Sequence, residues 1–366
     1  MLKIGMVGVG AISGIYLKNI TNYFREIKLE AVCDLIHERA QNAYDTYHVP
    51  KIYDTMEELF SDPEIDIVLN LTRPYQHFAV TKAALEAEKH VYSEKPLAAT
   101  FEEGKQLVEL AKEKKLFLGG APDTFLGAGI QTCRKLIDSG IIGKPIGAAA
   151  FMICRGHESW HPDPEFYYQR GGGPMMDMGP YYITALVNLL GQVKTVTGTV
   201  STPFAERLIT SEPHFGEIIS VEVPTTVNGI LEFDGGVVGT ITTTFDVYYP
   251  TQPRFEVYGS EGTMIVPDPN TFAGPVMIYH GKDGILKEMP LLFDYSENSR
   301  GLGLADMAKA IETGRDGRTL CDQTLHVLEI LTSFEKSSRI GRRVELETSF
   351  QRKAPMKCAM LPGVLD

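Results

Sequence analysis

The sequence contains no run of about 18 or more apolar residues, which is the length that a membrane-spanning helix needs. It is also short of positive charge, with 35 Lys and Arg against 47 Asp and Glu and a formal net charge of −12. Nucleic acid and anionic membranes repel a chain of this sign. We therefore expect no membrane span, and neither nucleic acid nor a membrane as a partner.

Cysteine is scarce and shows no pairing pattern. The five cysteines are odd in number, scattered and without CxxC spacing: Cys33, Cys133, Cys154, Cys321 and Cys358. This pattern predicts reduced structural thiols. The N-terminal MLKIGMVGVG has one lysine and no cleavage-site pattern, so it is typical of a buried strand rather than a signal peptide. Together these features predict a cytoplasmic protein.

The length of 366 residues suits two domains. In residues 1–122, compact apolar segments alternate with amphipathic helical stretches such as FEEGKQLVELAKEKK. The apolar segments are KIGMVGVG, LEAVCD, IDIVLNLT, HVYSEKP and LFLGGAP. Strands that alternate with helices predict βαβ units and a doubly wound parallel sheet.

In residues 123–366 the pattern changes to long strands rich in Val, Thr, Ile and Tyr. Asp234-Gly235 and Glu261-Gly262 lie where tight turns would join neighbouring strands. We expect an α/β protein whose second domain is α+β, with a large, mostly antiparallel open sheet. A sheet of this kind leaves one face to be covered, which predicts a homo-oligomer, a dimer or tetramer, through that sheet. The segment from Arg352 to Asp366 is either a docked arm or a mobile tail.

A glycine turn, GVGAIS at residues 8–13, follows the first predicted strand and opens a helix. Gly8 suits the tight turn, and Gly10 lets the backbone approach a pyrophosphate at the positive helix end. Asp34 ends the second strand, where a carboxylate accepts the ribose hydroxyls of NAD and repels the 2′-phosphate of NADP. The alternative is an adventitious glycine turn. The predicted NAD contacts here are Gly8, Gly10, Ala11, Ile12 and Asp34.

Two later strand ends should line the same nucleotide site, because ligands of doubly wound sheets lie beyond the carboxyl ends of strands. LNLTRPYQH offers Asn70, Thr72 and His77, and YSEKP offers Glu94 and Lys95. The alternatives are that His77 only caps a helix and that Glu94-Lys95 is an exposed charge pair. A proline directly after such a pair at the end of an apolar strand favours a functional role.

These features together resemble the glucose–fructose oxidoreductase and inositol dehydrogenase family. The resemblance rests on GVGAIS, Asp34, NLT-x-P-x-x-H (residues 70–77), Glu94-Lys95-Pro96 and GGGPMMDMGPY (residues 171–181), in the family's order and spacing. It implies an N-terminal Rossmann domain, a C-terminal domain whose sheet often forms the oligomer interface, and hydride transfer between nicotinamide and a carbinol. It also implies that Lys95 is the catalytic lysine and Asp177 the active-site aspartate.

The sequence departs from the family pattern at Tyr181. Inositol-dehydrogenase-like members carry a histidine at this position, whereas tyrosine resembles the glucose–fructose oxidoreductase and dimeric dihydrodiol dehydrogenase branch. This departure puts an inositol substrate in doubt. A second departure is Ala121-Pro122-Asp123-Thr124, where many members have an Asn-Arg or Tyr-Arg pair, so no substrate contact is carried over there.

Oxidation of a carbinol needs a base for the hydroxyl proton as well as the cofactor for the hydride. We expect Tyr181 to exchange the proton, Lys95 to polarise the substrate oxygen and to lower the pKa of Tyr181, and Asp177 to orient substrate or lysine. Lys95 as the direct base is the alternative. A helix that begins near Asp177 would place Asp177 and Tyr181 on one face.

The segment RGHESWHPDPEFYYQR (residues 155–170) should bind the substrate. His157, Trp160 and His161 suit a sugar, because an indole face covers C–H surface while polar groups bind hydroxyls. The alternative is an interdomain loop with satisfied histidines. We expect no metal, since Pro162 and Pro164 make the helix that His-x-x-x-His would need improbable.

Three functions fit these residues. The first is a cytosolic NAD-dependent dehydrogenase or reductase acting on a sugar, polyol or glycoside. The second is a redox-neutral glycosidase or lyase that oxidises its substrate transiently with bound NAD. The third is a non-catalytic nucleotide sensor, which would need none of Lys95, Asp177 and Tyr181.

Overall fold

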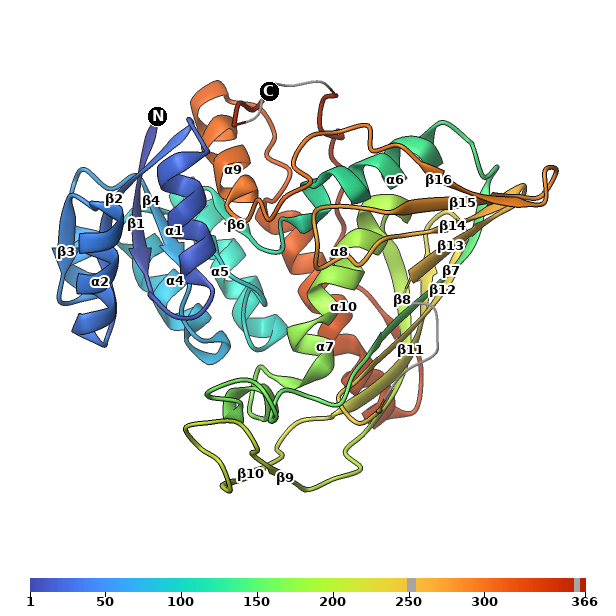
Figure 1. The fold of residues 1–366 in the computed structure, drawn as a ribbon, viewed down its shortest axis with the longest axis horizontal. Helices are drawn as coiled ribbons and strands as arrows, with labels where there is room; N and C mark the ends of the chain where they lie inside the picture. Colours follow the sequence, from blue (N-terminus) through green and yellow to red (C-terminus); the bar gives the residue numbers. More distant parts are fainter. Residues whose placement is uncertain (249–254, 359–362) are drawn as a thin grey trace.

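The computed structural model describes residues 1–248, 255–358 and 363–366. Its N-terminal part is built on a six-stranded parallel sheet in the order β3-β2-β1-β4-β5-β6 (Figure 1). The strands are β1 (Leu2–Val7), β2 (Ile27–Cys33), β3 (Lys51–Tyr53), β4 (Ile67–Asn70), β5 (His90–Ser93) and β6 (Leu118–Gly120). The strand order reverses between β1 and β4, so the doubly wound sheet is confirmed and its switch point lies at the glycine turn.

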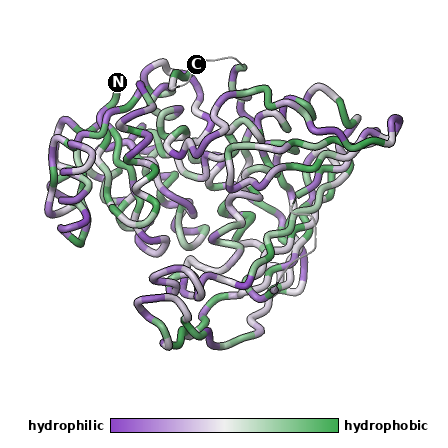
Figure 2. Tube along the Cα trace, viewed as in Figure 1, coloured by the Kyte–Doolittle hydropathy of each residue, from purple (hydrophilic) through white to green (hydrophobic). Residues whose placement is uncertain are grey.

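Helices cover both faces of this sheet: α1 (Ser13–Asn22), α2 (His37–Tyr47), α3 (Met56–Ser61), α4 (His77–Glu86) and α5 (Phe101–Lys114). Two of them begin at capping boxes, Thr55 with Glu58 and Thr100 with Glu103, which satisfy backbone donors at each helix start. The sheet strands are mostly hydrophobic whereas the outer helix α2 is mostly hydrophilic (Figure 2). This partition between a buried sheet and amphipathic helices is the one that the sequence pattern predicts.

The second sheet has nine strands in the order β16-β15-β14-β13-β7-β12-β11-β8-β17. Its strands are β7 (Pro145–Ile153), β8 (Val193–Ser201), β11 (Thr226–Phe233), β12 (Val238–Thr244), β13 (Phe255–Gly259), β14 (Gly262–Ile265), β15 (Val276–His280), β16 (Ile285–Met289) and β17 (Val344–Glu345). Every pair is antiparallel except β7 with β12, which confirms the large, mostly antiparallel sheet. A separate pair, β9 (Glu206–Leu208) and β10 (Ile218–Ser220), lies beside the short helix η3 (Glu165–Tyr168).

One face of the nine-stranded sheet is covered by helices. They are α6 (Ala128–Asp138), α7 (Gly173–Asp177), α8 (Gly179–Leu190) and α10 (Cys321–Ile340), whereas α9 (Leu302–Thr313) packs against β6 of the parallel sheet. Gly198 and Gly229 face each other across β8 and β11, and a Cβ at Gly229 would overlap the ring of Phe334 in α10. Glycine at this pair therefore lets α10 approach the sheet closely.

The two sheets are joined by helices from the end of the chain. Helix α10 packs against α5 and β6 as well as against β8, and Leu320 bridges to Gly119. The boundary that we predict near residue 122 thus falls where the chain first leaves the parallel sheet, although later helices return to it. Among the described residues, no helix combines the length and apolar character required to cross a bilayer.

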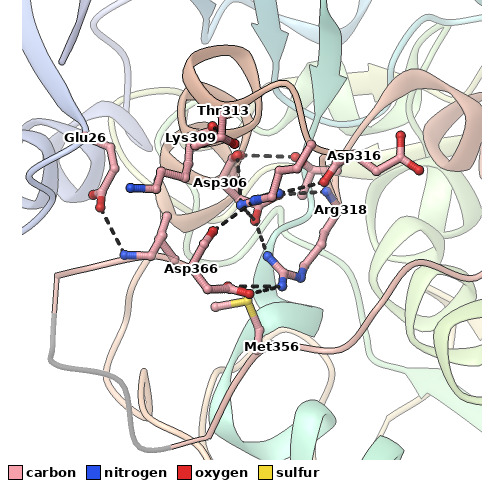
Figure 3. A network of polar contacts seen from close by, with 12 residues as sticks. Glu26, Asp306, Lys309, Thr313, Asp316, Arg318, Met356 and Asp366 are labelled. Carbon is pink, nitrogen blue, oxygen red and sulfur yellow. Dashed lines mark hydrogen bonds and ion pairs between the residues drawn. The ribbon is translucent and has the colours of Figure 1, made fainter.

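The described part of the C-terminal segment is a docked arm (Figure 3). Arg318 donates to both carboxylate oxygens of Asp366 at 3.0 and 2.9 Å and to Oδ1 of the buried Asp306 at 2.6 Å. The backbone N–H of Leu365 donates to Glu26 of the first domain at 3.0 Å. The arm therefore contacts both halves of the molecule.

Candidate active site and nucleotide site

The glycine turn lies between β1 and α1, and its shape lets other atoms approach the backbone closely. Gly8 has φ +96°, and a Cβ there would lie 2.8 Å from the carbonyl carbon and oxygen of Leu71. A Cβ at Gly10, by contrast, would meet no heavy atom of the described residues within 4 Å. The N-cap residue of α1, Ile12, offers no side-chain cap. Space above an uncapped, positive helix end fits the pyrophosphate of a dinucleotide.

Asp34 lies at the end of β2 beside this turn. Its Oδ2 accepts from the N–H of Val9 at 2.6 Å, and its Oδ1 accepts from the N–H of Ile36 at 2.8 Å. Each carboxylate oxygen has a further lone pair for a ribose hydroxyl. Nδ1 of the exposed His37 lies 2.9 Å from Oδ1 of Asp54. This arrangement fits NAD.

The structure brings together Asn70, Thr72 and His77. Their side chains form hydrogen bonds chiefly with one another and with neighbouring backbone groups. The Asn70 amide donates to the carbonyl of His77, and its Oδ1 accepts from the Thr72 hydroxyl at 2.6 Å. The ring nitrogens of His77 lie 2.6 and 3.0 Å from the carbonyl oxygens of Pro96 and Thr72. These bonds fix the loops after β4 and β5. Direct contacts of the three side chains with the cofactor stay a prediction.

Glu94 and Lys95 are not an exposed charge pair. Glu94 is 8% exposed, and it accepts from the Tyr16 hydroxyl at 2.7 Å and from the Lys95 N–H at 3.0 Å. The Nζ of Lys95 donates to Oδ1 of Asp177 at 2.7 Å and to the carbonyl of Asp177 at 2.8 Å. The lysine thus reaches from the parallel sheet to the second part of the chain, and the functional interpretation of Glu-Lys-Pro is favoured.

Asp177 and Tyr181 do not share a single helix, contrary to our expectation. Asp177 is the last residue of α7, and Tyr181 lies in the first turn of α8, which begins at Gly179. Pro180 explains the break, because it lacks an N–H and is tolerated only in a first helical turn. The two side chains nevertheless meet at Lys95, whose Nζ lies 5.2 Å from the centroid of the Tyr181 ring.

The charges around Lys95 and Tyr181 determine their protonation. Burial opposes the charge of Lys95, but Asp177, Tyr181 and Glu94 together outweigh it and the pKa of Lys95 is raised. Tyr181 is 7% exposed, and burial raises its pKa, while Lys95 and Arg300 act in the opposite direction. At neutral pH the lysine is therefore an ammonium and the tyrosine a phenol. Both groups therefore rest in their protonated forms, and neither is a direct base as it stands.

The loop from residue 154 to 170 brings His157 to the same carboxylate. Its Nε2 lies 3.5 Å from Oδ2 of Asp177, and its ring stacks on Tyr167 with centroids 3.9 Å apart. Trp160 adjoins this ring but is 62% exposed, so an apolar face remains open at the edge of the site. His161 lies next to Trp160, and its Nδ1 accepts from the N–H of Asp163 at 3.0 Å.

A buried ion network that the sequence analysis did not identify holds this loop. Arg207 on β9 donates to Glu158 at 3.1 Å and forms an ion pair with Asp246, and Tyr168 hydrogen-bonds to Glu158. Arg207, like Arg300, comes from a segment with no motif that would mark it. Within the described residues, no group of three or more His, Cys, Asp or Glu is arranged to hold a metal ion.

Comparison with known proteins identifies the family and supports the fold. Residues 2–119 match the model of the oxidoreductase family with an NAD-binding Rossmann fold, and residues 130–265 match the GFO/IDH/MocA C-terminal domain. The structure of levoglucosan dehydrogenase in complex with NADH and L-sorbose superposes with a TM-score of 0.81 at 21% identity, covering 95% of this chain and 99% of that one.

Similar protein sequences support the same family. An inositol 2-dehydrogenase/D-chiro-inositol 3-dehydrogenase of Lacticaseibacillus casei is 34% identical over 42% of this chain and 45% of its own, so this chain matches about half of that relative. A myo-inositol 2-dehydrogenase of Thermotoga maritima is 25% identical over 71% of this chain and 74% of its own. The chain therefore belongs to the glucose–fructose oxidoreductase and inositol dehydrogenase family and carries its NAD-binding Rossmann domain.

Proposed function

We propose that this protein transfers a hydride between NAD(H) and a carbinol of a sugar, polyol or glycoside. The observation that carries the proposal is the ion pair of Lys95 and Asp177, which joins the nucleotide domain to the second domain. A nucleotide sensor has no need of a desolvated ammonium at this place. The printed names of the relatives, dehydrogenases of inositols and of levoglucosan, support the same substrate class.

Each side chain has a role in this proposal. NAD, when bound along the glycine turn and beside Asp34, accepts the hydride. Lys95, held by Asp177, polarises the substrate oxygen, and Tyr181 exchanges the hydroxyl proton in partnership with Lys95. The proximity of the ammonium to the phenol ring opposes the effect of burial on the phenol pKa. Trp160 covers the C–H face of the sugar, and His157 and His161 bind hydroxyls.

The test is an assay of NADH formation with NAD and a panel of myo-inositol, levoglucosan, glucose and glycerol. We expect turnover with at least one compound, and a loss of about 100-fold or more in kcat for Tyr181→Phe. NAD released from the purified protein on denaturation, with product but no net NADH, would instead establish a redox-neutral glycosidase or lyase. Failure to bind NADH in a fluorescence titration overturns the proposal.

We also propose that the protein works in the cytoplasm as a homo-oligomer. None of the five cysteines, all of which lie in the described residues, forms a disulfide. Ile146, Ile230 and Val238, on adjacent strands of the large sheet, are exposed, and a partner copy would cover them. Light scattering of the purified protein tests the oligomer, and Ile230→Glu with Val238→Glu should shift it towards the monomer.

A further inference from the structure

Oxidation of a carbinol releases one proton as well as a hydride, and that proton needs an acceptor. The C–H and O–H bonds break, the hydride electron pair goes to NAD⁺, a C=O bond forms, and H⁺ remains. Lys95 and Tyr181 already carry their protons at neutral pH, so they can pass a proton on but cannot retain an additional one. A neutral base must lie next to them.

Asp177 connects the ammonium to such a base. Its Oδ1 accepts from Lys95 Nζ at 2.7 Å, and its Oδ2 lies 3.5 Å from Nε2 of His157. The second distance is longer than a normal hydrogen bond, so the two atoms face each other at a separation that a small movement of either side chain would close. The side chains of Lys95, Asp177 and His157 are 16, 12 and 11% exposed, so all three are largely shielded from water.

The surroundings keep His157 neutral, although two carboxylates near it would stabilise its imidazolium. Burial lowers the pKa of His157. The charged and titratable groups that face it are Asp177 at the end of α7, Lys95 after β5, and Glu158 and His161 in its own loop. Lys95 and His161 disfavour the imidazolium, whereas Asp177 and Glu158 favour it.

The rings packed on His157 belong to Tyr167, Trp160 and Phe245. Burial keeps the pKa of the Tyr167 phenol above its usual range, so none of these rings adds a charge at neutral pH. Asp177 is the carboxylate that directly faces Nε2, because Glu158 is held by Arg207.

We propose that His157 is the proton acceptor at the outer end of a relay that runs from Lys95 through Asp177. Because an ammonium has no free lone pair, Lys95 first gives one of its protons to Asp177, and Asp177 gives a proton from its carboxyl group to Nε2 of His157. Lys95, now an amine, takes up the proton of the Tyr181 hydroxyl, and Tyr181 takes the proton of the substrate hydroxyl. Lys95 and Asp177 end the step as they began it, and His157 becomes an imidazolium paired with the Asp177 carboxylate. The imidazolium then loses its proton to water, and in the reductive direction every step reverses.

The relay matters because a tyrosine, Tyr181, and not a histidine stands four residues after Asp177. The imidazole that the resemblance would place four residues after Asp177 is absent, and one reaches the same carboxylate from a different segment of the chain. The nearby Nδ1 of His157 is buried and has no hydrogen-bond partner within the described residues. A buried polar atom without a hydrogen-bond partner costs about 1–3 kcal/mol of folding free energy. Its retention suits a role for His157 beyond stacking on Tyr167.

The first test needs no substrate and uses ¹⁵N-histidine NMR of the protein saturated with NAD⁺. His157→Phe identifies the resonance. We expect the resting ring to carry its proton on Nδ1, Asp177→Asn to lower the pKa of His157, and Lys95→Met to raise it. A resting Nε2–H tautomer, or a pKa that neither variant changes, overturns the relay.

The second test rests on the proposed function and uses the compound of the panel that is oxidised fastest. The wild-type kcat for oxidation should fall as pH drops through the pKa of His157, because an imidazolium cannot accept the proton. His157→Phe, which keeps the stacked ring, should lose about 100-fold in kcat and lose this acid limb while retaining NADH affinity. His214→Gln, an exposed histidine bonded to Glu217, is the matched control and should keep the wild-type profile.

The two proposals fail separately. A wild-type protein that oxidises no compound of the panel counts against the proposed function, while the NMR titration still decides the arrangement of His157. An active wild type whose acid limb persists in His157→Phe excludes the relay and leaves the dehydrogenase proposal intact. A rate loss without loss of the limb likewise assigns His157 to packing and excludes the relay.

Discussion

Lys95 and Asp177, 82 positions apart in the sequence, meet with Nζ and Oδ1 2.7 Å from each other. The lysine follows strand β5 of the parallel sheet, and the aspartate ends a short helix of the second half. Both are largely shielded from water, so removal of either partner would leave the other as a desolvated charge. The pair therefore couples the two halves of the molecule at the point where we place the chemistry.

Lys95→Met should strongly reduce turnover while leaving nucleotide binding nearly unchanged. The methionine fills similar volume but removes the ammonium that polarises the substrate oxygen, so we expect kcat to fall by about 1,000-fold. NADH affinity, measured by fluorescence, should stay within several-fold of wild type. Asp177→Asn in the Lys95→Met background should add little, because the two residues act as a unit. Additive losses would show that they act independently.

Two alanine substitutions in the glycine turn should affect different properties. Gly8→Ala should reduce stability, and Gly10→Ala should weaken NADH binding. Gly8→Ala places a methyl 2.8 Å from backbone atoms of Leu71 at φ +96°, so we expect a loss of about 1–3 kcal/mol in unfolding free energy. Gly10→Ala meets nothing among the described residues within 4 Å and should leave thermal stability unchanged. It should weaken NADH binding, because the methyl occupies the space of the pyrophosphate. Equal stability losses would refute this distinction.

Asp34 should select NAD over NADP. Asp34→Ala removes the acceptor for the ribose hydroxyls and should weaken NADH binding by about 10-fold, while NADPH binding stays the same or improves. Asp34→Asn is the matched control for fold, because its single carbonyl oxygen can still accept from Val9 or Ile36. Parallel titrations with NADH and NADPH measure the ratio. A variant that keeps the wild-type ratio would exclude Asp34 from the ribose site.

The sequence predicts the parallel sheet well, because strand and helix periodicities differ and each segment ends at turn residues. It also predicts that Lys95, Asp177 and Tyr181 belong to one site. The break between α7 and α8 escaped prediction, although Gly179-Pro180 marks it, because the apolar periodicity of α8 seemed to continue back to Asp177.

Tertiary partners of the site were not predictable at all. Arg300, which opposes the rise of the Tyr181 pKa, lies in a loop before α9 with no motif around it. Arg207 reaches Glu158 from a two-stranded element that periodicity does not reveal. Such contacts depend on how separate segments pack, and a single sequence records neither the pairing nor its geometry.

The docked C-terminal arm should contribute measurably to stability in a pH-dependent way (Figure 3). Arg318→Met leaves Asp306, which is 0% exposed, with one fewer cation, so we expect about 3–5 kcal/mol of destabilisation in urea unfolding.

Burial opposes the charge of Asp366, but Arg318 outweighs it and lowers the pKa of that carboxyl. Its contribution is therefore present above the unfolded pKa of about 4 and is lost as pH falls through the lower folded value. Asp366→Asn should reduce stability at neutral pH and flatten this acid dependence, whereas Asp316→Asn, an exposed pair with Lys353, should change neither. An unchanged acid dependence in Asp366→Asn would show that the arm does not stabilise the fold through this carboxylate.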